Sequence, residues 1–87
     1  LGVHPNPFNP RTKIEFSVAE AGVIRLTIHD LAGRLVADLC EEPYERGRYY
    51  VIWGGLDAQQ RPVASGIYYY QMTGPAFSEK KKMALLK

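Results

Sequence analysis

The sequence predicts an all-β fold, a small antiparallel sandwich or barrel of six or seven short strands. In several segments apolar residues alternate with polar ones, which is the period of a strand with one buried face. Turn residues separate these segments at intervals of about ten residues, a spacing typical of small sandwiches and barrels. No segment carries the apolar stripe of a convincing amphipathic helix. At 87 residues the chain has room for one such domain.

The beginning of the chain predicts a linker. Pro5, Pro7 and Pro10 lack backbone donors and push the residues before them toward extended geometry, so neither a helix nor a central strand can form there. We therefore assign residues 1–11 to a proline-rich linker that docks onto the fold and residues 12–87 to the β-sandwich domain. Because the chain begins in loop-like sequence without an initiating Met, we interpret it as a domain cut from a longer protein.

Two strands are predicted before the first tight turn. Every second residue is apolar from Thr12 to Val18 and again from Ile24 to Ile28, and the segment 20–22 turns the chain between them. The intervening residues are polar, so we expect the outer faces of both strands, with His29 at the end of the second, to be solvated.

The next segment combines a turn and a third strand. Residues 30–33 predict a tight turn in which Gly33 takes a positive φ. Residues 34–40 fit a helical stripe as well as a strand, and their short length favours the strand. We expect the acidic, proline-containing segment 41–43 to end it, with Cys40 as a small apolar residue at its end.

Three further strands follow, rich in aromatic residues. The first is expected from Gly47 to Trp53, with alternate residues turned toward the core, and a polar hairpin connection over 56–62 comes next. The others are expected over 67–73 and 77–86. Of the three consecutive tyrosines in the first of these, Tyr68 and Tyr70 share one face and Tyr69 lies on the other, so at least one face carries exposed tyrosine.

The residues suited to catalysis or metal binding are few. His4 and His29 lie far apart with no acidic cluster at ligand spacing, which argues against a zinc site. Ser65 lacks the preceding glycine of a nucleophile elbow. A single cysteine, Cys40, excludes an internal disulfide and a multi-cysteine metal site. We expect no catalytic residue, no metal and no cofactor.

The charge is concentrated at the end of the chain. Residues 79–87 carry four lysines and one glutamate, a balance of +3 within an overall charge of +2. Such a strand attracts anionic partners or protects a sheet edge from aggregation. The absence of aromatic residues on a broader basic face argues against nucleic acid as a partner. The longest strongly apolar run, residues 49–53, is too short to span a membrane.

Four segments resemble, in order, the C-terminal sorting domains of the type IX secretion system, which overlap in sequence with the immunoglobulin-like domain of flagellar hook-capping proteins. The resemblance covers nearly the whole chain and implies an immunoglobulin-like antiparallel β-sandwich. The segments are Pro5-Asn6-Pro7-Phe8-Asn9-Pro10-Arg11-Thr12-Lys13-Ile14, Asp30-Leu31-Ala32-Gly33-Arg34-Leu35-Val36, Val63-Ala64-Ser65-Gly66-Ile67-Tyr68 and Lys82-Met83-Ala84-Leu85-Leu86-Lys87.

The resemblance implies a non-catalytic bacterial export signal. Such domains are bound in the periplasm by the outer-membrane secretion machinery and direct an upstream cargo domain across the outer membrane. A sortase-like transpeptidase typically then removes them and can attach the cargo to the cell surface. The expected locations are the periplasm in transit, then the extracellular space or outer-membrane surface. The residues expected to be recognised are Pro5, Asn6, Pro7, Gly33, Ser65, Gly66, Tyr68, Lys80, Lys81, Lys82 and Lys87.

Two other functions stay open, and one hairpin departs from the family pattern. An immunoglobulin-like structural module would self-associate through its strand edges into a surface filament or adhesin. A carbohydrate-binding accessory module would use exposed aromatic residues. Related sequences often have Trp-Asp-Gly-Arg-Asp and a further glycine where this chain has Trp53-Gly54-Gly55-Leu56-Asp57 and Gln60. The family pattern therefore does not predict the geometry of this hairpin or the contacts that the usual Asp and Arg would make. We expect the flanking strands to form despite the difference.

Overall fold

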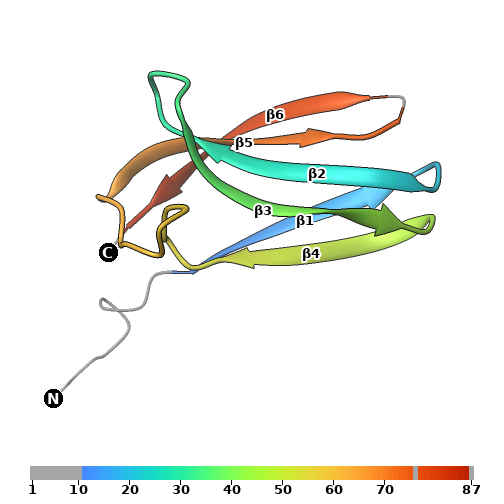
Figure 1. The fold of residues 1–87 in the computed structure, drawn as a ribbon, viewed down its shortest axis with the longest axis horizontal. Helices are drawn as coiled ribbons and strands as arrows, with labels where there is room; N and C mark the ends of the chain where they lie inside the picture. The colour runs from blue at the N-terminus through green and yellow to red at the C-terminus, as the bar shows by residue number, and fades with distance from the viewer. Residues whose placement is uncertain (1–10, 76, 87) are drawn as a thin grey trace, which may run out of the picture.

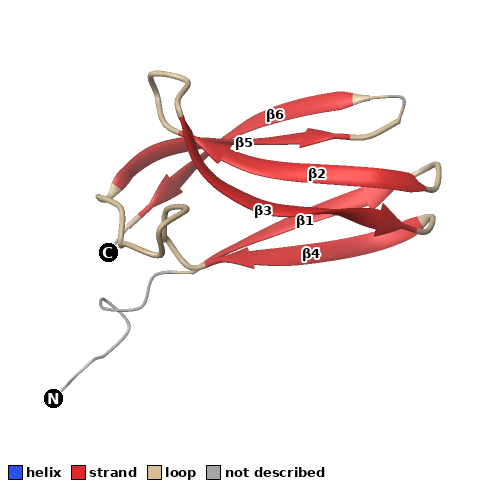
Figure 2. Cartoon of the chain, in the orientation of Figure 1, coloured by secondary structure: helices blue, strands red, loops and turns tan. Residues whose placement is uncertain are grey.

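The computed structural model describes residues 11–75 and 77–86, which form an all-β sandwich (Figure 1). The predicted fold class is confirmed. The six strands are β1 (Thr12–Val18), β2 (Gly22–His29), β3 (Leu35–Tyr44), β4 (Gly47–Trp53), β5 (Gly66–Thr73) and β6 (Ser78–Leu85). Turns and loops connect them (Figure 2), and the described residues include no helix of the length and hydropathy needed to cross a membrane.

Two antiparallel sheets face each other. β1 and β4 form the smaller sheet, and the larger one has four strands in the order β3-β2-β5-β6. The chain changes sheet after β1, after β3 and after β4, so several strands that are consecutive in sequence do not pair. This is the immunoglobulin-like arrangement, in which strands B and E lie opposite strands C′, C, F and G.

The core lies between the inner faces of the two sheets. It is built by the alternation that the sequence predicts, because every second residue of β1 from Ile14 to Val18 is buried. β4 and β5 contribute aromatic side chains to it. The buried apolar residues are Ile14, Phe16, Val18, Ile24, Leu26, Ile28, Ala37, Trp53, Tyr68, Met72 and Leu85.

The two ends of the sandwich carry different features. The connections after β1, β3 and β5 lie at one end, which we call the turn end (Figure 1). At the opposite end lie the start of β1, the turn over 30–34, the connection 54–65, the start of β5 and the end of β6. We call this the motif end, because each of the four family-like segments contributes described residues to it.

β3 corrects one prediction. It does not end at Cys40 but runs on through the segment 41–43 to Tyr44. β3 is an edge strand, where the missing N–H of a proline can face away from the neighbouring strand. An ion pair also links β3 to β2, since Arg25 Nη2 on β2 lies 3.0 Å from Asp38 Oδ2 on β3. Cys40 is therefore a half-buried residue within a strand.

The outer face of β2 corrects a second prediction. Thr27 is buried rather than solvated, with 6% of its surface exposed. Its Oγ1 lies 2.9 Å from Nε2 of the half-buried His29. The pairing of β2 with β3 shifts register beside both residues, at Leu26/Thr27 and at Ile28/His29. At each shift the edge strand β3 has one residue more than β2, which is the pattern of a β-bulge. Alternation along β2 alone therefore does not predict the burial of Thr27 and His29.

Candidate recognition site

The family-like segments meet at the motif end of the sandwich. The turn 30–34 and the segment 65–68 are far apart in sequence, yet together they line a shallow depression of about 380 Å³. Gly66 at the start of β5 pairs with Leu85 at the end of β6, which brings the last family-like segment to the same end. Thr12, at the start of β1, pairs with Trp53, whose ring lies against Tyr68.

Tyr68 fixes the connection 54–65 to the start of β5. Tyr68 is 8% exposed, and its ring packs edge-on against Trp53, with the centroids 5.3 Å apart. Its hydroxyl donates to the Ala64 carbonyl oxygen at 2.6 Å. An immunoglobulin-like domain commonly has such a tyrosine corner, in which a tyrosine near the start of strand F binds backbone a few residues upstream. Burial raises the pKa of Tyr68. A partner at the motif end would therefore contact mainly the residues around it.

The turn 30–34 is organised by one carboxylate. Asp30 Oδ1 accepts the backbone N–H of Ala32 at 3.0 Å and of Arg34 at 2.9 Å, while Arg34 Nε donates to Oδ2 at 3.0 Å. These bonds, led by the backbone N–H of Arg34, hold the pKa of Asp30 below its usual value. Gly33 has the predicted positive φ, 87°. Leu31 is left 64% exposed at the tip.

The connection 54–65 contains a second turn of the same geometry. Asp57 Oδ1 accepts the N–H groups of Gln59 and Arg61 at 2.9 Å each, and Arg61 Nε donates to Oδ2 at 3.2 Å. The pKa of Asp57 is lowered by the same kinds of bond, first that from the N–H of Arg61. Gln60 occupies the position that corresponds to Gly33 and has a φ of 66°. The unusual hairpin sequence therefore keeps an ordered, Asp- and Arg-bound turn.

The two turns predict opposite responses to substitution. Gln60→Gly should raise the free energy of unfolding by about 0.5–1 kcal/mol. Removing the Cβ relieves a left-handed backbone that costs about 1–2 kcal/mol. Part of this gain is lost because glycine makes the unfolded chain more flexible. Gly33→Ala should lower it by about 1 kcal/mol. A Cβ at Gly33 would meet no atom within 4 Å, so the loss would come from the backbone alone. Urea denaturation of both variants measures the difference, and a destabilising Gln60→Gly would contradict this account.

The lysines of β6 lie on both faces of the sheet. Lys80 and Lys82 are on the outer face with Tyr69, and Lys80 Nζ sits 4.8 Å from the centre of the Tyr69 ring. Lys81 pairs with Tyr70 on the inner face. As predicted, Tyr69 lies opposite its two tyrosine neighbours, but it is half-buried. The run of three lysines is thus divided between two surfaces.

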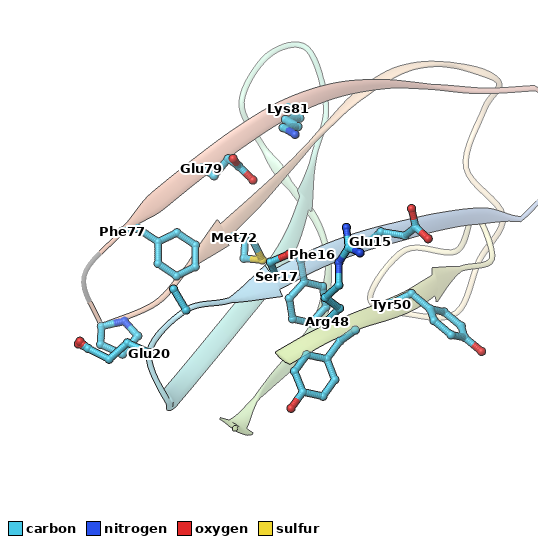
Figure 3. A pocket seen from close by; sticks show the side chains of 13 residues that line it. Glu15, Phe16, Ser17, Glu20, Arg48, Tyr50, Met72, Phe77, Glu79 and Lys81 are labelled. Carbon is cyan, nitrogen blue, oxygen red and sulfur yellow. The ribbon is translucent and has the colours of Figure 1, made fainter. Parts of the chain in front are cut away.

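A groove lies between β1 and β6 near the turn end (Figure 3). It has a volume of about 830 Å³. Phe16 and Met72 form its floor, and Lys81 and Glu79 of β6 face it from one side (Figure 3). Its other lining residues are Glu15, Ser17, Ala19, Glu20, Arg48, Tyr49, Tyr50, Pro75 and Phe77. Only part of the larger sheet's inner face is therefore covered by the smaller sheet.

The structure brings together some of the predicted site residues and places others elsewhere. Ser65, Gly66 and Tyr68 line the depression beside the turn that contains Gly33. Lys80, Lys81 and Lys82 lie along β6, away from that depression. Pro5, Asn6, Pro7 and Lys87 lie outside the described residues.

Sequence reasoning missed the carboxylates that hold the two turns and the exposed side chain of Leu31. The spacing shared by Asp30 with Arg34 and by Asp57 with Arg61 was the available signal, since an aspartate commonly binds the backbone two residues on in a turn. Within residues 11–75 and 77–86, no group of three His, Cys, Asp or Glu side chains is arranged to hold a metal ion.

Comparison of the chain with protein-family models, with curated proteins and with solved structures gives no significant match.

Proposed function

We propose that this domain is a non-catalytic sorting domain, recognised by the type IX secretion machinery for export of an upstream cargo across the outer membrane. In this role the domain is itself the ligand. Its partners are the outer-membrane machinery and a sortase-like transpeptidase, and it passes through the periplasm to the cell surface or the extracellular space.

The observation that carries this proposal is the meeting of the family-like segments at one end of the sandwich. The turn 30–34 and residues 65–68 line one depression, and the end of β6 pairs beside them. Leu31 and Ile67 are exposed at the motif end, by 64% and 39% respectively. Packing of the core therefore does not explain why these positions are apolar. Exposed apolar residues grouped on an ordered turn suit binding by another protein.

Carbohydrate binding has less support. Trp53 and Tyr68 are enclosed in the core, and Tyr49 and Tyr70 are half-buried against it. The exposed Tyr50 and the half-buried Tyr69 lie on the outer faces of different sheets, so these two do not form one stacking platform. Self-assembly into a filament is the remaining alternative, and the experiment below separates it from sorting.

Export can be measured with the 87-residue domain fused behind a signal peptide and a fluorescent protein, in a host that has the type IX machinery. We expect fluorescence at the cell surface or in the medium. Retention in the periplasm would overturn the proposal, and retention together with filaments would favour the structural module. Deleting residues 79–87 is a poor test, because it also removes Leu85 from the core.

A matched pair of point variants tests the motif end itself. Leu31→Glu should reduce export about tenfold or more by placing a charge in an apolar contact. Val23→Glu is the control, because Val23 is 54% exposed on β2 close to the turn end. Both variants should keep the circular dichroism of the parent domain. Equal export of the two variants would show that the motif end is not the recognised surface.

A further inference from the structure

The groove between β1 and β6 is bordered by two strand edges. Among the described residues β6 pairs only with β5, and β1 pairs only with β4. The unpaired side of each strand presents backbone N–H and C=O groups that can bind another extended chain. β6 has eight residues, so an added strand would run along about 27 Å of backbone.

The interior of the groove suits apolar side chains. Phe16 and Met72 are buried beneath it, and Phe77 lies at its turn end with 37% of its surface exposed. Side chains of an added strand alternate between the two faces of the sheet. Those on the inner face would enter the groove beside Lys81, and those on the outer face would lie beside Lys80 and Lys82.

Charge determines which kind of chain fits. β6 carries three lysines against one glutamate, Glu79, and all four are exposed. If two copies paired through β6 in a symmetric antiparallel register centred on Lys81, the two Lys81 side chains would lie opposite each other. Like charges directly opposite each other destabilise a strand pair. In that register the edge of β6 disfavours a second copy, and its excess of lysines over Glu79 favours an acidic partner.

We propose that β6 accepts an added strand from an acidic, extended segment of a partner protein, whose alternate apolar side chains fill the groove. Carboxylates on the other face of that segment pair with Lys80 and Lys82. Backbone hydrogen bonds supply affinity, and the alternation of acidic with apolar residues supplies specificity. This inference deepens the proposed function, because it names the surface that the secretion machinery would bind and the kind of segment that would bind it. It rests on the proposed function only for the identity of the partner.

Synthetic peptides provide the test. The probe is a fluorescein-labelled peptide of about ten residues in which glutamate alternates with valine or isoleucine, long enough for one strand. Fluorescence anisotropy with the whole domain should show saturable binding that weakens as salt is added. A peptide of identical composition in scrambled order and one with lysine in place of glutamate should each bind at least about tenfold more weakly.

Two alternately N-methylated peptides separate strand addition from simple charge attraction. One carries N-methyl groups on the odd residues and the other on the even residues. In an antiparallel ladder only alternate N–H groups point at the neighbouring strand, so one peptide should lose binding and the other should keep it. If both keep it, or if the lysine peptide binds equally well, the proposal is wrong.

Charge reversal locates the site on the domain. Lys80→Glu/Lys82→Glu should weaken the acidic peptide about tenfold or more, with an unchanged far-ultraviolet circular dichroism spectrum. Arg11→Glu/Arg46→Glu makes the same change in net charge at exposed positions outside β6 and should retain binding. Equal loss in both variants, or no binding by the parent, would overturn strand addition at β6. Neither result depends on export, so a failure here and a failure of the fusion assay are distinguishable.

Discussion

Trp53→Ala should lower the free energy of unfolding by about 3–5 kcal/mol, the usual cost of removing a large buried aromatic side chain. The indole is 2% exposed, packs against Tyr68 and donates from Nε1 to the Leu56 carbonyl oxygen at 3.0 Å. A domain of 87 residues has about 4–13 kcal/mol of stability to lose. Urea denaturation followed by far-ultraviolet circular dichroism should therefore show a midpoint displaced far toward low urea, or an unfolded variant.

A more conservative variant keeps this prediction measurable if the alanine variant does not fold. Trp53→Phe retains a ring against Tyr68 but leaves the Leu56 carbonyl oxygen without its indole donor, so its loss should be about half as large or less. Should Trp53→Ala lose under about 1 kcal/mol, the indole would not occupy the well-packed position described here.

Phe16→Ala should cost about 3–4 kcal/mol at the other end of the core. Its ring is 6% exposed, meets Tyr44 edge-on with centroids 5.3 Å apart and stacks on Tyr49 at 5.7 Å. Tyr44 in turn donates its hydroxyl to Cys40 Sγ at 3.7 Å, and burial together with this bond raises the pKa of Tyr44 to about 12. Because Trp53 remains in this variant, its fluorescence can follow the unfolding.

Phe16→Leu is the control for this position, since it keeps most of the apolar volume and should cost less than about 1.5 kcal/mol. Combining it with Trp53→Phe should give the sum of the two losses within about 0.5 kcal/mol, because the two rings share no aromatic partner. A large departure from additivity would mean that the two ends of the core are coupled.

The strands could be predicted because this core is made by alternation. In β1 the apolar residues stand at every second position from Ile14 to Val18, and the buried side chains follow that period. β2 follows it except at the buried Thr27, and in β4 the more exposed positions alternate with the less exposed ones although the apolar residues are consecutive. β3 was predicted too short, because local residue preferences say nothing of sheet order, and a proline is tolerated once the strand is known to be at an edge.

The candidate surfaces could be predicted only in part. The family-like segments indicate which residues matter, but their meeting at one end depends on the pairing of β1 with β4 and of β5 with β6. The groove between β1 and β6 had no sequence signal, because it results from the smaller sheet covering only part of the larger one. Likewise, the run of lysines does not reveal that Lys81 faces the interior side.

The position of β1 and β6 has a mechanical consequence. β1 begins and β6 ends at the motif end, and the two strands lie in different sheets with no shared hydrogen-bond ladder. A pulling force applied between the start of β1 and the end of β6 would therefore separate β1 from β4, and β6 from β5, one residue pair at a time. It would not load all the hydrogen bonds of one ladder at once. Single-molecule stretching between these two points should therefore record unfolding at low force.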